Sequence, residues 1–572
     1  MLLPTLQTDN SSSAGLYKMT TRDLIQTFTG YNHNLRTPDG SFFDMGNLTS
    51  DLYPVMTQRK QRGTIGSVTS PNGIVTNEKL AYVDGTTLYY DGEATGLTTL
   101  SDGEKQMVPI GSKICIFPDG KYYDTADGSY GSLGLSVTGL SSVKFVLCQN
   151  ISTEFNVDPP TTKPVNPSNG DYWLDTGSTP NVLKQWSSSS GVWTSVPTTY
   201  VKIKKAGIGS GISTGDAVTM AGCDDAQFNT SLIIRACGSD YLVVTGIIAA
   251  SFTNSGAISL TREIPTMQFF VQLNNRIWGC SADGHHLYAC ALGDPKNWKK
   301  FDGIASDSYE VTIGSDGPFT GAAAYRNTIY FFKEGRFHKI YGTQPSNFEV
   351  TDSIINGVKK GADRSIVQIE SYLYYLSPSG VVVFDGTFAT SIADAFGQEQ
   401  FSAGVAGTVD FKYYISMKDA SDAWHLFVYD TRRGMWHRED DLHVLGFSHL
   451  DGELYALTSD SLIAMKGSSG TAEGALDWYA ESGDIGLDLP DYKYVSRIVL
   501  RVRIGASSML RVLVGYDDGP MKEVGHFFET DLHLKQIPIV PERCDHMRIR
   551  MEGHGEFRLY SMAKVIEQGS EL

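Results

Sequence analysis

The stretch Arg326-Asn-Thr-Ile-Tyr-Phe-Phe332, followed by the turn Glu334-Gly335 and by Phe337-His-Lys-Ile-Tyr341, decides the fold. It consists of a polar turn, an apolar strand, a glycine-containing turn and a second apolar strand, which is the pattern of a β-hairpin. The same unit recurs along the chain, and its equivalent apolar positions are Ile277, Ile329, Leu373, Tyr413 and Leu454. A unit that returns at a steady period indicates a repeat architecture, in which neighbouring copies bury each other's faces.

The period of the repeat identifies the kind of architecture. Successive equivalent positions are 52, 44, 40 and 41 residues apart, and a four-stranded propeller blade takes about 40–50 residues. Two earlier copies begin at Lys79 and Lys113, which brings the number of units to seven. The sequence therefore predicts an all-β chain built on a β-propeller of about seven blades.

Outside the repeat, the sequence also favours strands. Only Thr20–Phe28 and Thr390–Phe401 have the pattern of short helices. Elsewhere, short runs rich in Val, Ile, Tyr, Phe and Thr alternate with turn residues, and the 59 glycines far outnumber the 21 prolines. Residues 140–264 are too long for a loop between blades, so we expect an inserted β module there.

The last part of the chain has a different pattern. Strands such as Ser496-Arg-Ile-Val-Leu-Arg-Val-Arg503 largely alternate arginine with apolar residues, as half-exposed antiparallel strands do. We therefore expect a separate C-terminal β-sandwich. The predicted organisation is an N-terminal arm (1–58), the first propeller blades (59–139), the inserted β module (140–264), the remaining blades (265–468) and the C-terminal β-sandwich (471–572).

Composition excludes several classes of protein. The 572 residues carry 47 Lys and Arg against 64 Asp and Glu, a net charge of −17, which argues against general nucleic-acid binding. With 41% hydrophobic and 19% charged residues, the chain is not disordered. No apolar run reaches the roughly 18 residues of a membrane span, and Met1–Asn10 lacks the features of a secretory signal. The seven scattered cysteines predict reduced, buried thiols.

Searches for reactive chemistry in the sequence give no catalytic, cofactor-binding or metal-binding residues. The adjacent pair His285–His286 points to opposite faces of a strand, so it is a poor metal site. Gly207-Ile-Gly-Ser-Gly-Ile212 departs from the dinucleotide-binding fingerprint at its sixth position. The acidic run Glu439-Asp-Asp441 is expected to be a solvated loop.

Two clusters are candidate binding residues. The basic run containing Arg59, Lys60 and Arg62 could meet an acidic neighbouring subunit or form an ordinary solvated turn. In the insertion, Trp173, Trp186 and Trp193 lie in a predicted small β-meander, and such aromatic side chains are candidate glycan contacts.

Several short motifs resemble one protein family. They are Phe28-Thr-Gly-Tyr-Asn32, Thr37-Pro-Asp-Gly40, Asp44-Met-Gly-Asn-Leu48, Tyr53-Pro54, Arg59, Arg262-Glu-Ile-Pro265, Asn275-Arg-Ile-Trp-Gly-Cys280, Cys544-Asp-His-Met-Arg-Ile-Arg-Met-Glu-Gly553 and Gly569-Ser-Glu-Leu572. Together they look like the propeller-bearing tail nozzle, or packaged-DNA stabilisation, proteins of tailed bacteriophages. The resemblance spans most of the chain and implies a virion tail component, assembled in the host cytoplasm.

The resemblance also implies partners. It implies a homo-oligomeric ring, with a hexamer favoured, that contacts the portal or its adaptor and other tail proteins. Genomic DNA would pass through the lumen of the ring without sequence-specific binding, and the excess of acidic residues would keep the DNA from adhering. Solubility explains the same net charge equally well.

Three functions follow as hypotheses. The first is a non-enzymatic ring component, a tail nozzle or head-to-tail connector, that retains packaged DNA and serves its ejection. The alternative is a phage or cell-surface adhesin, in which a propeller scaffold carries a glycan-binding face. The third is an enzyme that cleaves surface polysaccharide, which would require paired carboxylates at the separation seen in glycosidases.

Overall fold

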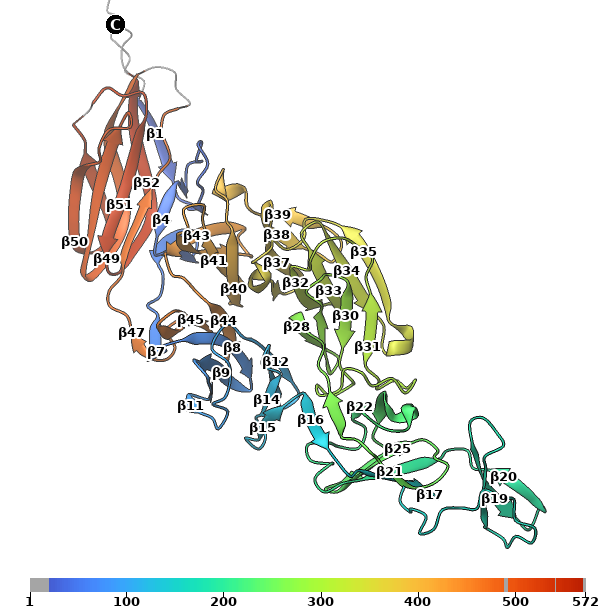
Figure 1. The fold of residues 1–572 in the computed structure, drawn as a ribbon. Helices are drawn as coiled ribbons and strands as arrows, with labels where there is room; N and C mark the ends of the chain where they lie inside the picture. Colours follow the sequence, from blue (N-terminus) through green and yellow to red (C-terminus); the bar gives the residue numbers. More distant parts are fainter. Residues whose placement is uncertain (1–19, 488–491, 541, 569–572) are drawn as a thin grey trace, which may run out of the picture.

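The computed structural model of the chain describes residues 20–487, 492–540 and 542–568. The secondary structure of these residues consists of strands and four short 3-10 turns. Figure 1 shows an elongated molecule with three parts: a ring of small sheets in the middle, a large sheet at one end that contains the first and last described strands, and the inserted module at the other end. Within the described ranges, no helix is long and apolar enough to cross a membrane.

The ring is a seven-bladed propeller. Blade 1 contains β8 (Pro71–Asn77), β9 (Lys79–Asp84), β10 (Thr87–Tyr90) and β11 (Glu93–Ala94), and blade 2 contains β12 (Gln106–Ile110), β13 (Lys113–Phe117), β14 (Lys121–Asp124) and β15 (Tyr130–Ser132). Blade 3 contains β28 (Gln268–Leu273), β29 (Arg276–Cys280), β30 (His286–Ala289) and β31 (Tyr309–Thr312). Blade 4 contains β32 (Gly321–Tyr325), β33 (Thr328–Lys333), β34 (Arg336–Tyr341) and β35 (Glu349–Ile354).

The remaining three blades follow without interruption. Blade 5 contains β36 (Val367–Ile369), β37 (Tyr372–Ser377), β38 (Gly380–Phe384) and β39 (Ala389–Ser391). Blade 6 contains β40 (Ala403–Val409), β41 (Lys412–Lys418), β42 (Trp424–Asp430) and β43 (Met435–Asp440). Blade 7 contains β44 (Gly446–Leu450), β45 (Glu453–Leu457), β46 (Ser461–Ala464) and β7 (Gly63–Ser67). The first strand of each blade lies at the axis, where β8 contacts both β12 and β44, so the ring is closed.

The last blade closes the ring with a strand from the other end of the propeller sequence. Its fourth strand, β7, precedes the first blade in the chain and pairs with β46 through Ser461↔Ser67 and Leu462↔Gly66. The short strand β47 (Thr471–Ala472) also pairs with β7. Because two segments far apart in sequence share one sheet, opening the ring requires breaking this sheet.

The polar dipeptide of each repeat is a tight turn. Arg326 and Asn327 join β32 to β33, and both have positive φ values, 49° and 55°, as a two-residue type I′ hairpin requires. The strand that follows, β33, is buried at all six positions. Neighbouring blades cover both of its faces, which explains why the sequence Thr-Ile-Tyr-Phe-Phe is a continuous apolar run.

The insertion leaves the propeller after the second blade and returns before the third. Its first sheet has the order β16 (Leu135–Leu140), β27 (Ile258–Arg262), β22 (Ala217–Ala221) and β23 (Ser231–Ile233). Its second sheet has the order β24 (Ala236–Gly238), β25 (Tyr241–Thr245), β21 (Tyr200–Lys204), β17 (Lys144–Cys148) and β26 (Phe252–Thr253). Its third sheet has the order β18 (Tyr172–Asp175), β19 (Val182–Ser187) and β20 (Val192–Ser195). They share one apolar core that includes Phe145, Phe228 and Leu242. The strands begin at Leu135, slightly before the expected boundary.

The C-terminal part differs from the expected β-sandwich. It is one nine-stranded sheet that curls into a nearly closed barrel, containing β48 (Asp477–Glu481), β49 (Lys493–Tyr516), β50 (Lys522–Pro538), β51 (Met547–His554) and β52 (Phe557–Gln568). The first half of β49 pairs with β52 and its second half with β51. A register shift between Ile504 and Met509 marks the change of partner, so a single long strand belongs to both halves, and the described residues of this part form one sheet.

The expected N-terminal arm is also incorporated into sheets. Its strands β1 (Thr20–Ile25), β4 (Asp44–Gly46), β5 (Leu48–Leu52) and β6 (Val55–Gln58) belong to the C-terminal barrel, while β2 (Gly30–Tyr31) and β3 (Ser41–Phe42) extend the sixth blade. The helix expected at Thr20–Phe28 is therefore wrong, because that segment pairs with β52 as a strand. Of Thr390–Phe401, only Asp394–Phe396 is helical, as a 3-10 turn. Residues 1–19 and the motif Gly569–Leu572 lie outside the described residues.

Candidate functional site

The three candidate tryptophans of the insertion lie on one face of the sheet β18-β19-β20. Trp186 pairs directly with Trp193 across β19 and β20, and Trp173 pairs with Lys184 across β18 and β19. The Trp186 and Trp193 ring centroids are 5.5 Å apart, and those of Trp173 and Trp193 are 5.6 Å apart. The structure therefore brings all three predicted residues into one contiguous aromatic cluster, called here the aromatic tip.

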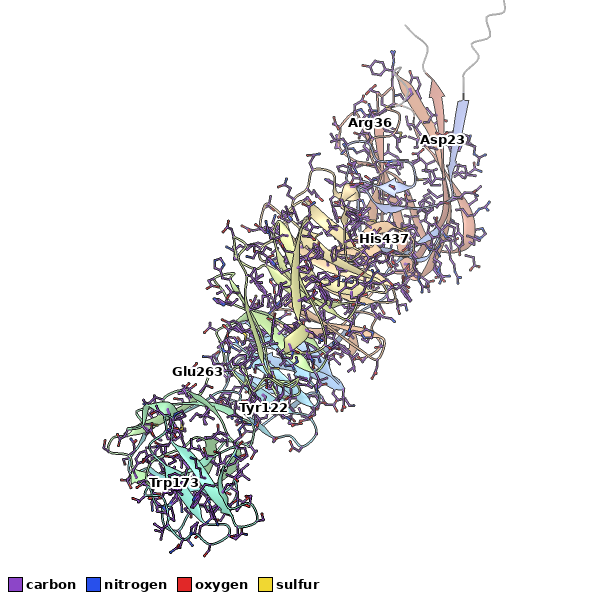
Figure 2. The ribbon with its side chains drawn as sticks, turned by 90° about the vertical axis from the view of Figure 1, so that its right-hand side faces the viewer. Asp23, Arg36, Tyr122, Trp173, Glu263 and His437 are labelled. Atoms are coloured by element: carbon purple, nitrogen blue, oxygen red, sulfur yellow. The ribbon has the colours of Figure 1, made fainter. Side chains whose placement is uncertain are left out.

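The opposite face of this small sheet anchors it to the insertion. Leu174 and Leu183 pair across the sheet and are fully buried. Tyr172 packs edge-on against Phe155, with ring centroids 5.0 Å apart. Because side chains alternate between the faces of a strand, anchoring this face leaves the tryptophans on the other one, where each ring is half-buried. Figure 2 places Trp173 at the end of the molecule opposite Asp23.

Two lysines flank the aromatic tip. The Lys184 ammonium lies 4.8 Å from the Trp173 ring centroid and 2.8 Å from the Asp175 carboxylate. The hydrogen bond from Lys184 lowers the pKa of Asp175. Lys163 lies 5.7 Å from the same ring and, within the described part of the chain, has no ion-pair partner. The tip therefore has an apolar surface with one uncompensated positive charge at its edge.

The basic cluster Arg59, Lys60 and Arg62 does not form the expected surface. Only Lys60 is exposed, whereas Arg59 and Arg62 are buried. The guanidinium of Arg62 lies 2.7 Å from both Glu439 and Asp440. The expectations of a subunit contact and of a solvated turn are therefore both wrong for the two arginines, because acidic residues of the same chain neutralise them.

The acidic run Glu439-Asp-Asp441 is correspondingly no solvated loop. Glu439 and Asp440 end strand β43, and Glu439 is buried. Burial disfavours the charged form of Arg62, but the attraction and hydrogen bonds of Asp440 and Glu439 outweigh this effect and raise the pKa of Arg62. Arg59 also pairs with Glu473, which follows the last blade. This network ties the chain entering the propeller to its sixth blade and to the segment that leaves it.

A cavity of about 670 Å³ occupies the axis of the propeller. Each of the seven innermost strands, or the residue just before it, contributes to the wall; representatives are Ile74, Met107, Gln268, Ala322, Ile366, Val405 and Phe447. A cavity of this size is in the range of small-molecule sites. We call it the axial cavity.

Arg364 crosses the axial cavity. It belongs to η3 (Asp363–Ser365), and its guanidinium donates to Leu445 O at 2.7 Å and to Lys105 O at 3.2 Å, while lying 2.7 Å from Glu104. These partners precede the first strands of the seventh and second blades. One side chain thus joins three blades across the axis.

Three other wall residues have unusual environments. Burial raises the pKa of the Asp363 carboxyl, opposed by Arg364 and reinforced by Glu104. Among the described residues, the Asp363 carboxylate and the Gln268 amide have no hydrogen-bond partner. Phe269 has a φ of +52° at a register shift of β28, a conformation that bulky residues rarely adopt. No sequence motif marks these residues.

One group of side chains could hold a metal ion. Ligand atoms of Asp484, Asp518 and His546 lie within 4.8 Å of one another. However, Arg548 donates to Asp484 at 2.5 Å and lies 3.8 Å from Asp518. Because the guanidinium already neutralises these carboxylates, the cluster is explained as an ion-pair network.

All seven cysteines are unpaired, and six of them are buried.

No protein-family model and no curated protein matches the sequence. Among solved structures, the chain is similar to β-propeller proteins. One is the exo-β-1,3-galactanase of Phanerochaete chrysosporium, at 10% identity and a TM-score of 0.22, with 52% of this chain and 95% of that chain covered. Another is the phage phi92 endosialidase, at 9% identity and a TM-score of 0.26, with 77% and 74% covered. Likeness at this level identifies neither a family nor an activity.

Proposed function

We propose that this protein is a carbohydrate-binding attachment protein, in which the propeller and barrel form a scaffold and the aromatic tip contacts the glycan. The observation that carries the proposal is the position of Trp173, Trp186 and Trp193 on one accessible face at the far end of an elongated molecule. We assign no catalytic step to the protein.

The chemistry of the tip suits a sugar. The C–H groups of a pyranose ring carry partial positive charge, and the face of an indole ring carries partial negative charge, so the two surfaces attract each other as they exclude water. Rigid aromatic side chains also lose little conformational entropy on binding. The unpaired Lys163 at the edge adds an attraction for a carboxylate, sulfate or phosphate group on the glycan.

A glycan array probed with the whole protein tests this proposal. We expect selective binding to a subset of glycans, enriched in acidic ones, and loss of that binding in the Trp186→Ala variant. Trp424→Ala is the matched control, because Trp424 stacks on His443 on the propeller, away from the tip. Absence of selective binding by the folded protein, or equal binding by Trp186→Ala, would contradict the proposal.

A second candidate is a virion ring component, the tail nozzle or connector suggested by the sequence motifs. The structural feature that favours it is β50, an edge strand of 17 residues whose one partner among the described strands is β49. Phe528, Leu532 and Leu534 along this strand are 66%, 49% and 46% exposed. An exposed apolar edge is unusual for a monomer and suits a contact between subunits.

Under this candidate, copies of the chain form a closed ring, with the hexamer as the expectation, and DNA passes between copies. Phe528→Asp combined with Leu532→Asp should convert such an oligomer to a monomer, as measured by mass photometry. A wild-type protein that is monomeric under virion-like ionic conditions would argue against the ring and leave the attachment function in place.

A further inference from the structure

The axial cavity has the features of a second binding site, independent of the aromatic tip. It is lined by residues of all seven blades, and its wall combines aromatic and aliphatic side chains with many polar groups. In a site of this kind, apolar side chains supply contact area and the polar groups fix the orientation of the ligand.

The charges in the cavity are already compensated. The Lys105 ammonium lies 2.9 Å from Asp119 and 2.8 Å from the Ser101 hydroxyl. The Arg364 guanidinium is neutralised by Glu104 and hydrogen-bonded to two carbonyl groups. An anionic ligand would therefore find no free cation among the described wall residues, and the remaining polar groups favour an uncharged ligand.

Those remaining groups are the Asp363 carboxyl and the Gln268 amide. A carboxylate accepts hydrogen bonds from ligand hydroxyl groups, and an amide both donates and accepts them. Both residues are half-buried, so their polar atoms are accessible to water or to a ligand. A ligand with several hydroxyl groups would satisfy both.

Aromatic side chains of the cavity wall supply an apolar surface beside these polar groups. Phe447 and Phe269 both line the cavity. The left-handed backbone at Phe269 and the bulge that contains it are costly features, and such strain is concentrated at functional sites. Phenylalanine rings beside hydroxyl-binding groups suit a ligand that has both an apolar C–H face and hydroxyl groups.

We propose that the axial cavity binds an uncharged saccharide unit, either a free mono- or disaccharide or the terminal residue of a longer glycan, with Asp363 and Gln268 as hydrogen-bonding groups and Phe269 as an apolar wall. Arg364 acts as a positioning residue that holds three blades at the closed side of this site. The proposal is independent of the attachment function.

Ligand-observed NMR with the full chain tests it. The probes are glucose, galactose, N-acetylglucosamine and lactose, and a biantennary neutral glycan distinguishes a terminal residue from a free sugar. We expect at least one probe to bind, with affinity at least tenfold weaker in Asp363→Ala and in Phe269→Gly, which removes the ring but tolerates the positive φ. Trp186→Ala and the exposed outer-blade variant Asp352→Ala should bind as the wild type does.

The melting temperature of each variant verifies that it is folded, and Gln268→Ala carries the test if Asp363→Ala does not fold. Absence of binding by the folded wild type to every probe would overturn the proposal. So would binding that is insensitive to all cavity substitutions. Binding lost only in Trp186→Ala would assign the sugar to the aromatic tip and would also overturn the axial site.

Discussion

The guanidinium of Arg62 lies 2.7 Å from the carboxylate of Glu439, although the two residues are 377 positions apart and both side chains are less than 10% exposed. The pair connects the segment that enters the propeller to its sixth blade. Buried ion pairs are strongly destabilising when one partner is removed, because the other charge stays buried.

We therefore expect Arg62→Met to lower the free energy of unfolding by about 3 kcal/mol. The double variant Arg62→Met/Glu439→Gln should recover part of that loss, because it removes the buried charge of Glu439 and leaves Arg59 beside Asp440. Urea denaturation provides the measurement. The exposed pair Arg511–Glu523 supplies the control, and Glu523→Gln should change stability by less than about 1 kcal/mol. Equal losses in Arg62→Met and Glu523→Gln would contradict a stabilising role for the buried pair.

The closure of the ring through β7 can be tested with two glycines of that strand. A Cβ atom at Gly63 would lie 1.9 Å from the carbonyl oxygen of Ser469, whereas at Gly66 it would meet no atom within 4 Å. We expect Gly63→Ala to destabilise the protein by about 1–3 kcal/mol, as overpacking does. Gly66→Ala should be neutral.

Hydrogen exchange gives a local measurement of the same effect. Amide protection in β46 should fall in Gly63→Ala and remain unchanged in Gly66→Ala. If both variants retain wild-type protection, β7 does not hold the seventh blade closed.

His437 predicts a pH dependence of stability. It is 1% exposed, neither ring nitrogen has a hydrogen-bond partner among the described residues, and burial lowers its pKa to about 3. Lys412 also lowers this pKa, and Asp430 and Asp51 oppose the shift. The unfolded chain therefore binds a proton near pH 6.5 that the folded chain does not bind until about pH 3. The contribution of the neutral His437 to the free energy of unfolding is complete above pH 6.5 and is lost as the pH falls from 6.5 towards 3.

The slope for one such proton is about 1.4 kcal/mol per pH unit. Between pH 6 and pH 5, the unfolding free energy of the wild type should fall more steeply than that of His437→Gln, by roughly this amount. His554, an exposed histidine paired with Asp477, supplies the control variant His554→Gln. Parallel curves for wild type and His437→Gln would contradict a neutral buried His437.

Lys163 should set the charge preference of the aromatic tip. Its ammonium is the uncompensated cation beside Trp173. We expect Lys163→Gln to weaken binding of an acidic glycan about three- to tenfold while leaving its neutral analogue unaffected, and to reduce the salt dependence of binding. The exposed cation Lys60 supplies the control Lys60→Gln. An equal effect on both glycans would assign Lys163 a structural role.

Much of the propeller could be predicted from the sequence because its signals are local. The turns at Arg326-Asn327 and Asp451-Gly452 are dipeptides with positive φ values, and the strands beside them are short apolar runs. Each blade is a meander of neighbours in sequence, so its pairing follows from the order of the strands. The fold class, with its inserted module, was predictable for this reason.

The barrel was not predictable, because its pairing is long-range. The Thr57 hydroxyl donates to Phe557 O at 2.9 Å, across 500 residues of sequence. No local pattern indicates that residues 20–58 should join C-terminal strands. For the same reason the basic run at Arg59 and the acidic run at Glu439 were each interpreted as surface features, although each neutralises the other.

The two candidate sites also differ in how far they could be predicted from local sequence. The aromatic tip could be predicted because Trp186 and Trp193 lie on adjacent strands of a short meander, so one hairpin brings them together. Asp363 and Phe269 could not, because the axial cavity forms only when seven blades converge and a single aspartate or phenylalanine has no distinguishing sequence pattern.

The most direct test of the central claim, that the aromatic tip binds carbohydrate, is a calorimetric titration of the full protein with the best glycan from the array. The account predicts saturable binding by the wild type and by Trp424→Ala, and at least tenfold weaker binding by Trp186→Ala and Trp193→Ala, with all four proteins equally folded. Wild-type affinity in both tip variants, or no binding by any folded protein, would contradict it.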